Sequence, residues 1–306
     1  MIGIGRYSNV LEDAYWERVN KNVSVKDQNA ILCSCVKFLP ADFFVAGANF
    51  KELILAPYNK LKKAHAYMQK HRKIMESECF QWNASGELER NALYQKLYDA
   101  YGKVSRSMVN KTKMSVKLVR ETGVTVCPYC NRDYINSRSG RISGAQLDHF
   151  YPRSEYPIFS VSLYNLVPVC GNCNRIKSDK SGKFASPFDE TIDWENSIRF
   201  TYAPLDTDRK KIIIDAKGPI KNNVKKMHIN TAYQIHSIEV NELLEKVEMY
   251  NDSQFEEFRK VLGEAGLTES EMKRMVFGPE ITTERMKTKP LGRMMRDLER
   301  ELGVYE

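Results

Sequence analysis

Two pairs of cysteines are the residues whose type and spacing point most directly to a chemical role. Cys127 is paired with Cys130 and Cys170 with Cys173, each with two residues between them. This spacer lets both thiolates of a pair reach one ion, and two pairs complete a tetrahedral shell that is typical of structural zinc. Since only about 0.2 such pairs would arise by chance at this cysteine content, we predict one four-cysteine site for Zn²⁺. The alternative is four buried cysteines that share the spacing by coincidence.

The segment between the two pairs is long enough to carry a second site. It spans residues 131–169, which is 39 residues, against roughly 15 to 20 in an ordinary zinc ribbon. Within it, His149 directly follows Asp148. A histidine titrates near neutral pH and suits a general base, whereas a carboxylate is an oxygen ligand of the kind that Mg²⁺ prefers. The amide of Asn174, directly after the second cysteine pair, offers another oxygen ligand.

The chemistry that needs such a set of residues is the hydrolysis of a phosphodiester. A water must lose its proton while negative charge grows on the phosphoryl and leaving oxygens, so the reaction needs a base and a cation. Successive residues of a strand point to opposite faces, so Asp148 and His149 can share a direction only where the strand ends and bends. The following Tyr151-Pro152 predicts such a bend. We therefore predict that His149 is the base and that Asp148 and Asn174 bind Mg²⁺ or Mn²⁺.

In their order and spacing, these residues resemble the HNH endonuclease superfamily. The matching elements are the two cysteine pairs, Asp148-His149, Asn165-Leu166 and Cys173-Asn174-x-x-Lys177. The resemblance implies a ββα-metal core clamped by zinc, in which Asn165 braces the loop that orients His149. The common family pattern has His where this chain has Asn174, although some members use Asn there, so the affinity and choice of the catalytic metal stay open.

Two residues of this pattern also fit roles outside catalysis. Asn165 fits a turn residue after a strand nearly as well as a bracing residue. Lys177 lies about one helical turn after Asn174. We favour a contact between Lys177 and a phosphate, and the alternative is the end of a solvated helix.

The elements that must position these side chains are short. The sequence predicts a strand over residues 145–150, a segment over 163–169 that leads to the second cysteine pair, and a helix over 174–180. We expect an α+β, mostly α-helical protein with a ββα-metal core and helical flanks. Its expected parts are an N-terminal helical region (1–121), a nuclease core with the zinc site (122–188) and a C-terminal region (189–306). In the last part, "IRFTYAP" and "KKIIID" predict a hairpin around the turn "LDTDR", and helices follow.

The charge balance favours a polyanionic partner. The chain has 47 Lys and Arg against 39 Asp and Glu, a net charge of +8. Residues 102–120 contain no acidic side chain, and read as one helix they place a basic stripe on about a third of its circumference. We predict that this stripe binds nucleic acid, the alternative being a solvated helix face. Its members are Lys103, Arg106, Lys113, Lys117 and Arg120.

Other features of the composition indicate where the protein acts. The chain has seven cysteines and begins without a basic segment followed by an apolar run, which argues against a disulfide framework. No stretch approaches the roughly 18 apolar residues of a membrane span. We therefore expect a cytoplasmic protein with no membrane association. The tail, with "LLEKVEMYND" and "KPLGRMMRDLE", resembles the C-terminal helices of the nuclease subunit of Septu-like bacterial anti-phage systems, which implies a role in defence and an ATPase partner protein.

The function that the sequence predicts best is a metal-dependent HNH endonuclease that hydrolyses DNA. The expected cofactors are a structural Zn²⁺ and a catalytic Mg²⁺ or Mn²⁺. Two alternatives stay open, a zinc-knuckle module that binds nucleic acid without cutting it and an HNH nuclease that cuts RNA. The combination of Asp148, His149 and Asn174 argues against the first, because binding alone needs no base beside a metal.

Overall fold

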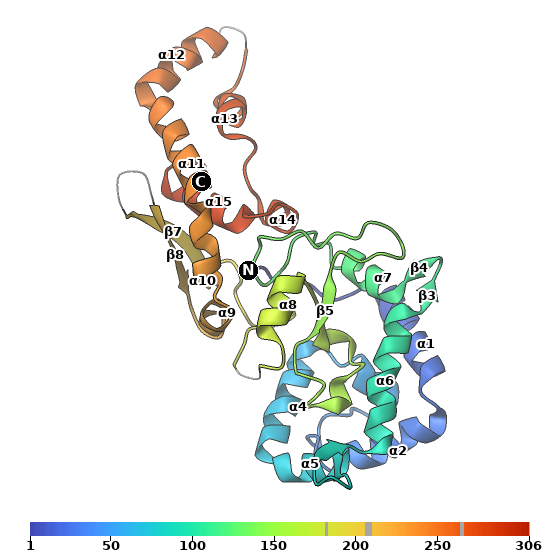
Figure 1. Ribbon diagram of the computed structural model, residues 1–306. Coiled ribbons are helices and arrows are strands. Elements are labelled where there is room, and N and C mark those ends of the chain that lie inside the picture. The colour runs from blue at the N-terminus through green and yellow to red at the C-terminus, as the bar shows by residue number, and fades with distance from the viewer. Residues whose placement is uncertain (181–182, 206–209, 264–265, 306) are drawn as a thin grey trace. The chain divides into compact units, whose positions relative to one another are not determined.

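The computed structural model describes residues 1–180, 183–205, 210–263 and 266–305 (Figure 1). About half of the chain is helical, and the strands of the described residues form small two-stranded sheets. This confirms the prediction of an α+β protein in which helices dominate. No helix of the described residues combines the length and the apolar character needed to cross a bilayer.

The chain divides into two compact units. The N-terminal unit comprises Gly3–Tyr129 and Asp133–Ile192, and the C-terminal unit comprises Met1–Ile2, Cys130–Arg132 and Asp193–Glu306. Apart from a few residues, the two regions expected at 1–121 and 122–188 thus lie in one unit. The two units are described separately below.

Helices form most of the N-terminal unit, and several begin at a side-chain cap. Ser8, Ser24, Asn49 and Asn91 each accept a hydrogen bond from a backbone N–H three residues further on, which satisfies a donor that the first turn leaves unpaired. The helices are α1 (Asn9–Asn22), α2 (Val25–Cys35), α3 (Phe50–Ile54), α4 (Tyr58–Lys70), α5 (Arg72–Cys79), α6 (Ala92–Arg106), α7 (Met114–Glu121) and α8 (Gly171–Lys177), with the short 3₁₀ helices η1 (Pro157–Phe159) and η2 (Leu163–Asn165). The strands are β1 (Phe80–Trp82), β2 (Leu88–Arg90), β3 (Met108–Val109), β4 (Thr112–Lys113), β5 (Gln146–His149) and β6 (Leu166–Val169).

The single basic helix expected over residues 102–120 is wrong. Helix α6 ends at Arg106, a tight hairpin of β3 and β4 follows, and α7 begins at Met114. The hairpin turns at Asn110 and Lys111, whose φ angles of 49° and 63° lie in the left-handed region. A two-residue turn with positive φ at both positions suits the twist of a hairpin and interrupts a helix. The basic residues of 102–120 therefore do not lie along one continuous helix.

The strand predicted over residues 145–150 is present as β5. It pairs antiparallel with the fully buried β6, and His149 lies opposite Leu166. Helix α8 follows β6 and packs beside β5 (Figure 1). The helix begins three residues earlier than predicted because the Cys170 side chain caps it, accepting from the N–H of Cys173.

The C-terminal unit is built on a hairpin covered by helices. Strands β7 (Ile198–Pro204) and β8 (Lys210–Ala216) pair antiparallel, which confirms both predicted strands; of the predicted turn 205–209, residues 206–209 lie outside the described residues. Helix α15 packs on β7, whereas α9, α10 and α11 pack on β8. The helices are α9 (Ile220–Lys226), α10 (Ile229–Tyr233), the 3₁₀ helix η3 (Gln234–His236), α11 (Ser237–Met249), α12 (Asp252–Gly263), α13 (Glu269–Phe277), α14 (Thr283–Met286) and α15 (Gly292–Glu301).

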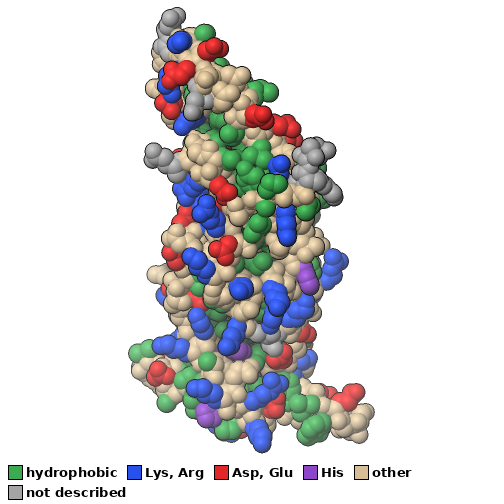
Figure 2. Space-filling model, turned by 90° about the vertical axis from the view of Figure 1, so that its left-hand side faces the viewer, with side chains coloured by type: hydrophobic (Ala, Val, Ile, Leu, Met, Phe, Trp, Pro, Cys, Tyr) green, Lys and Arg blue, Asp and Glu red, His purple; other side chains and the backbone are tan. Residues whose placement is uncertain are grey.

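The surface of this unit carries large apolar side chains. Ile213, Ile235 and Ile238 are exposed, and Figure 2 shows hydrophobic side chains gathered on one face of the unit. The Lys and Arg side chains in the same view are dispersed over the surface.

Candidate metal centre and adjoining pocket

The four paired cysteines come together in the structure. The Sγ atoms of Cys127, Cys130, Cys170 and Cys173 all lie within 4.8 Å of one another, and all four residues are buried. In a tetrahedral zinc site with Zn–S bonds of about 2.3 Å, the sulfur atoms lie about 3.8 Å from one another. A small decrease in the distances between the four Sγ atoms would therefore give zinc-binding geometry. The cluster confirms that the two pairs form one site, and the site can bind a metal such as zinc.

Hydrogen bonds to sulfur support the same assignment. The backbone N–H of Cys173 donates to Cys170 Sγ at 3.4 Å, and that of Arg132 donates to Cys130 Sγ at 3.4 Å. Such bonds stabilise the thiolate form, which is the form that binds a metal. Among the described residues, this is the one group of three or more His, Cys, Asp or Glu side chains placed to share an ion.

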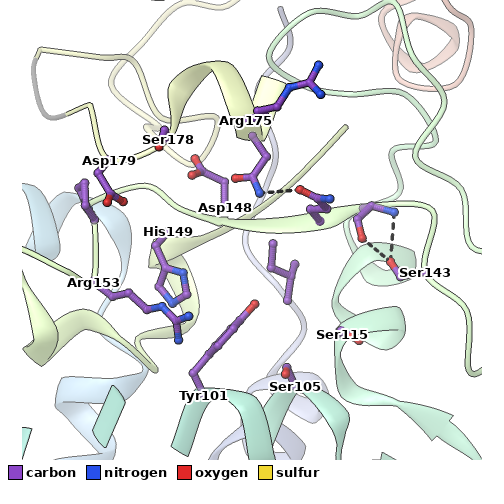
Figure 3. Close-up of a pocket in the computed structure, with 15 residues that line it drawn as sticks. Tyr101, Ser105, Ser115, Ser143, Asp148, His149, Arg153, Arg175, Ser178 and Asp179 are labelled. Carbon is purple, nitrogen blue, oxygen red and sulfur yellow. Dashed lines mark hydrogen bonds between the residues drawn. The ribbon is translucent and has the colours of Figure 1, made fainter. Parts of the chain in front are cut away.

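A pocket of about 610 Å³ runs along the strand β5 in the N-terminal unit. Asp148, His149 and Asn174 all line it. In the described residues β5 pairs only with β6, so its other edge is unpaired. Side chains from both faces of a strand reach such an edge. This explains how Asp148 and His149 share a pocket although they project from opposite sides of β5 (Figure 3). The expectation that a bend would turn both in one direction is wrong.

Asp148 is buried within a hydrogen-bond network. Its side chain is about 4% exposed, Tyr129 donates to its Oδ2 at 2.7 Å, and Lys177 Nζ lies 3.0 Å from its Oδ1. Burial raises the pKa of Asp148, whereas the Lys177 ammonium and the Tyr129 hydroxyl favour the ionised form. Tyr129 lies between Cys127 and Cys130 in the sequence. Its hydroxyl therefore connects the cysteine cluster to the carboxylate of Asp148.

The prediction that Lys177 contacts a phosphate is wrong for this structure. Lys177 is fully buried, and its ammonium donates both to Asp148 and to the backbone oxygen of His149 at 3.1 Å. Its position three residues after Asn174 turns it toward β5, where its charge balances a buried carboxylate. The sequence alone could not reveal this because the partner lies 29 residues away.

His149 is held in one tautomer. Its Nε2 lies 2.9 Å from the backbone oxygen of Ser160, which can only accept, so Nε2 carries the proton. Burial, aided by the charges of Arg153 and Lys177, lowers the pKa of His149 to about 3, although the Ser160 bond opposes this shift. The imidazole is therefore neutral at pH 7 with a lone pair on Nδ1. The described residues provide no hydrogen bond to Nδ1, so its lone pair is available to accept a hydrogen bond from a water or a substrate group.

Asn165 ties together the loop that follows β5. Its amide donates to the backbone oxygens of Tyr151 at 3.0 Å and Phe159 at 3.1 Å, and its oxygen accepts from the Tyr151 N–H at 2.8 Å. Because Ser160 follows Phe159 directly, Asn165 fixes the carbonyl that orients His149. Asn165 is completely buried.

Asn174 lies on the first turn of α8 with its side chain toward β5. Its Nδ2 donates to Oε1 of Gln146 at 2.7 Å, which leaves its own oxygen available as a ligand. Gln146 and Asp148 are two residues apart on β5 and share one face. Mg²⁺ commonly takes one or two protein oxygens and completes its shell with water and phosphate. Asp148 and Asn174 each carry an oxygen of this kind.

The basic residues of the predicted stripe take up different positions. Arg106 ends α6, Lys113 lies in β4, and Lys117 in α7 pairs with Glu121 at 3.9 Å. The Lys113 N–H donates to the backbone oxygen of Gly140 at 2.8 Å. This contact places the β3–β4 hairpin against a loop that carries two exposed arginines, Arg138 and Arg141, which the sequence analysis did not single out.

Sequence reasoning also missed four residues of the site. Tyr129 and Gln146 bond to predicted ligands, and Tyr101 and Arg153 line the pocket beside His149. Of these four residues, only Tyr129 could have been predicted from the sequence, because it lies between two of the paired cysteines. The others are placed by tertiary contacts.

Comparisons with protein-family models, with curated proteins and with solved structures find no match to this chain.

Proposed function

We propose that this protein is a metal-dependent endonuclease of the HNH type that hydrolyses DNA phosphodiester bonds. The observation that carries the proposal is that His149, Asp148 and Asn174 line one pocket. The four-cysteine cluster and the order β5, β6, α8 support it, because a zinc-clamped ββα unit is what the resemblance implies.

In this proposal His149 is the general base. Its Nδ1 accepts a proton from the attacking water, and the Ser160 carbonyl holds the Nε2–H so that the ring cannot turn. Asp148 and Asn174 would hold Mg²⁺ or Mn²⁺, which when bound stabilises the charge that grows on the phosphoryl oxygens. The products are 5′-phosphate and 3′-hydroxyl ends. Action in anti-phage defence and an ATPase partner are further proposals, which rest on the resemblance of the tail.

A binding module without cleavage is the second candidate. It is favoured by one observation, that both oxygens of Asp148 already accept hydrogen bonds, from Tyr129 and Lys177. A carboxylate oxygen has two lone pairs, so these bonds still leave acceptor positions for an ion.

Incubation with plasmid DNA and with structured RNA, with Mg²⁺, with Mn²⁺ and with EDTA, separates the candidates. The proposal expects metal-dependent cutting of DNA. Cutting of RNA alone would move the substrate to RNA, and binding without cutting in any metal would overturn the nuclease in favour of the module. Two variants refine the test: Asn174→Ala should need more metal for cutting, and Asn174→His should retain activity because imidazole also binds these ions.

A further inference from the structure

Arg153 lies in the pocket on the same side of β5 as His149. Figure 3 shows its guanidinium beside the imidazole, with Tyr101 close to both. The side chain is partly exposed and lines the pocket. Nothing in the proposed roles of Asp148, His149 and Asn174 accounts for an arginine at this place.

Two tyrosines of α6 hold the guanidinium in position. Its central carbon lies 3.9 Å from the ring centroid of Tyr98 and 4.9 Å from that of Tyr101. The Tyr101 ring in turn meets the His149 ring edge-on at 4.5 Å between centroids. A guanidinium stacked on aromatic rings keeps the N–H groups at its edge free to donate in its own plane.

No acidic side chain neutralises this arginine within the described residues. Its one hydrogen bond is a long contact of 3.5 Å from Nη1 to the backbone oxygen of Tyr98. The carboxylate of Asp148 projects from the other side of β5 and is engaged by Tyr129 and Lys177. Asp179 also lines the pocket, but among the described residues it forms no ion pair with Arg153. The guanidinium therefore presents a planar set of donors to the pocket.

Such a group is complementary to a phosphate. A guanidinium can donate two parallel N–H bonds to two phosphate oxygens, which fixes both the place and the orientation of the anion. We propose that Arg153 binds the backbone phosphate that is presented to His149. This inference rests on the proposed function. It specifies that the pocket recognises a backbone phosphate of the substrate and not a base.

Arg90 provides a matched control. Its guanidinium carbon lies 3.8 Å from the centroid of the same Tyr98 ring, and its Nε donates to Gln95 at 3.0 Å. Arg90 is not among the residues that line the pocket. If stacking on Tyr98 is the only role of Arg153, substitution of either arginine should have the same effect. If Arg153 binds a phosphate, only its substitution should weaken DNA binding and cleavage.

The test combines cleavage kinetics with a binding measurement that needs no cleavage. Arg153→Gln should lower kcat/KM on DNA by about 10²-fold, Arg153→Lys should fall between wild type and Gln, and Arg90→Gln should stay within about twofold of wild type. Binding to duplex DNA is measured in EDTA with the His149→Ala protein, which should not cut. The slope of log K against log salt concentration should become shallower by about 0.9 when Arg153→Gln is added. It should not change when Arg90→Gln is added instead.

Two results would overturn the inference. One is an unchanged salt slope with Arg153→Gln, and the other is an equal effect of Arg90→Gln on slope and cleavage. Because the slope is measured without cutting, it also separates the two proposals. If wild type cuts no substrate but the slope still falls by about 0.9, the phosphate contact stands and the nuclease proposal fails.

Discussion

Each unit of this protein buries charged side chains, and the two sets are used differently. In the C-terminal unit, α15 buries Arg293 and Asp297, whose side chains form an ion pair at 3.0 Å. Arg293 also donates to the backbone oxygen of Trp194, and Asp297 accepts from the backbone N–H of Phe200 at 2.9 Å. These charges tie α15 to the chain around β7.

The buried charges of the N-terminal unit lie beside an open pocket. Asp148 and Lys177 form an ion pair at 3.0 Å as well, but their neighbours are a cysteine cluster and a histidine whose Nδ1 is available. Buried charge by itself therefore does not mark a functional site. Arg293 and Asp297 also border a pocket, of about 500 Å³, so a pocket does not distinguish the two ion pairs. What distinguishes Asp148 is the next residue, His149, whose Nδ1 has no hydrogen-bond partner among the described residues.

The largest expected effect concerns the cysteine cluster. Cys173→Ser should lose the bound ion and unfold the N-terminal unit's core, because a four-thiolate zinc site contributes on the order of 10 kcal/mol of apparent folding free energy. Elemental analysis and thermal melting measure this. Cys33→Ser, at an exposed cysteine outside the cluster, should keep both the zinc and the melting temperature. Full zinc content in Cys173→Ser would contradict the assignment.

The Arg293–Asp297 ion pair of α15 should be important for the stability of the protein but not for the chemistry in the pocket along β5. Asp297→Ala leaves Arg293 buried without its partner and should cost about 3 to 5 kcal/mol in denaturant unfolding. Glu301→Ala removes a more exposed carboxylate of the same helix, which accepts from Thr201 at 2.7 Å and pairs with Arg199 at 3.6 Å, and it should cost less than about 1 kcal/mol. If Asp297→Ala unfolds like wild type, this pair does not hold α15 in place.

Tyr129→Phe tests the network around Asp148 by removing one oxygen. The loss of a buried hydrogen bond should cost about 1 to 2 kcal/mol, and the Mn²⁺ concentration needed for half-maximal cutting should rise. Tyr94→Phe is a matched control, since that hydroxyl bonds to Ser34 at 3.0 Å and lies outside the pocket. It should cost similar stability and leave the metal dependence unchanged. Equal metal dependence in both variants would remove Tyr129 from the site.

The smallest expected effect is a change of the unfolding free energy with pH, caused by Glu299 on α15. Burial raises the pKa of Glu299 to about 7 from an ordinary value of 4.5. Between these values the unfolded chain releases the proton and the folded chain keeps it, so stability falls as pH rises from about 4.5 to 7. Glu299→Gln should therefore stabilise the protein at pH 8, on the order of 1 kcal/mol, and less at pH 5. Equal unfolding free energies of variant and wild type at both pH values would contradict this.

Local patterns predicted the parts of the molecule that depend on neighbours in sequence. The spacing of the cysteines predicted one cluster, and alternation and turn residues predicted β5, β7 and β8. The place of Asp148 and His149 in one pocket was also expected, although by a bend and not by an unpaired edge.

Long-range contacts decided what the sequence could not reveal. Lys177 resembled a surface residue because its partner Asp148 is distant in the chain. The prediction of one basic helix failed because the hairpin of β3 and β4 separates α6 from α7, which a 3.6-residue periodicity of basic residues does not reveal. The turn at Asn110 lacks the glycine that usually marks such hairpins, so the local signal was weak.

His149→Ala removes the proposed general base. Cutting of DNA should fall by at least about 10²-fold, while the zinc content, the melting temperature and the affinity for uncut DNA stay near wild type. His71→Ala, at a histidine stacked on Tyr67 outside the pocket, should cut at the wild-type rate. A folded His149→Ala protein that cleaves as fast as wild type, in a preparation free of contaminating nuclease, would contradict the account.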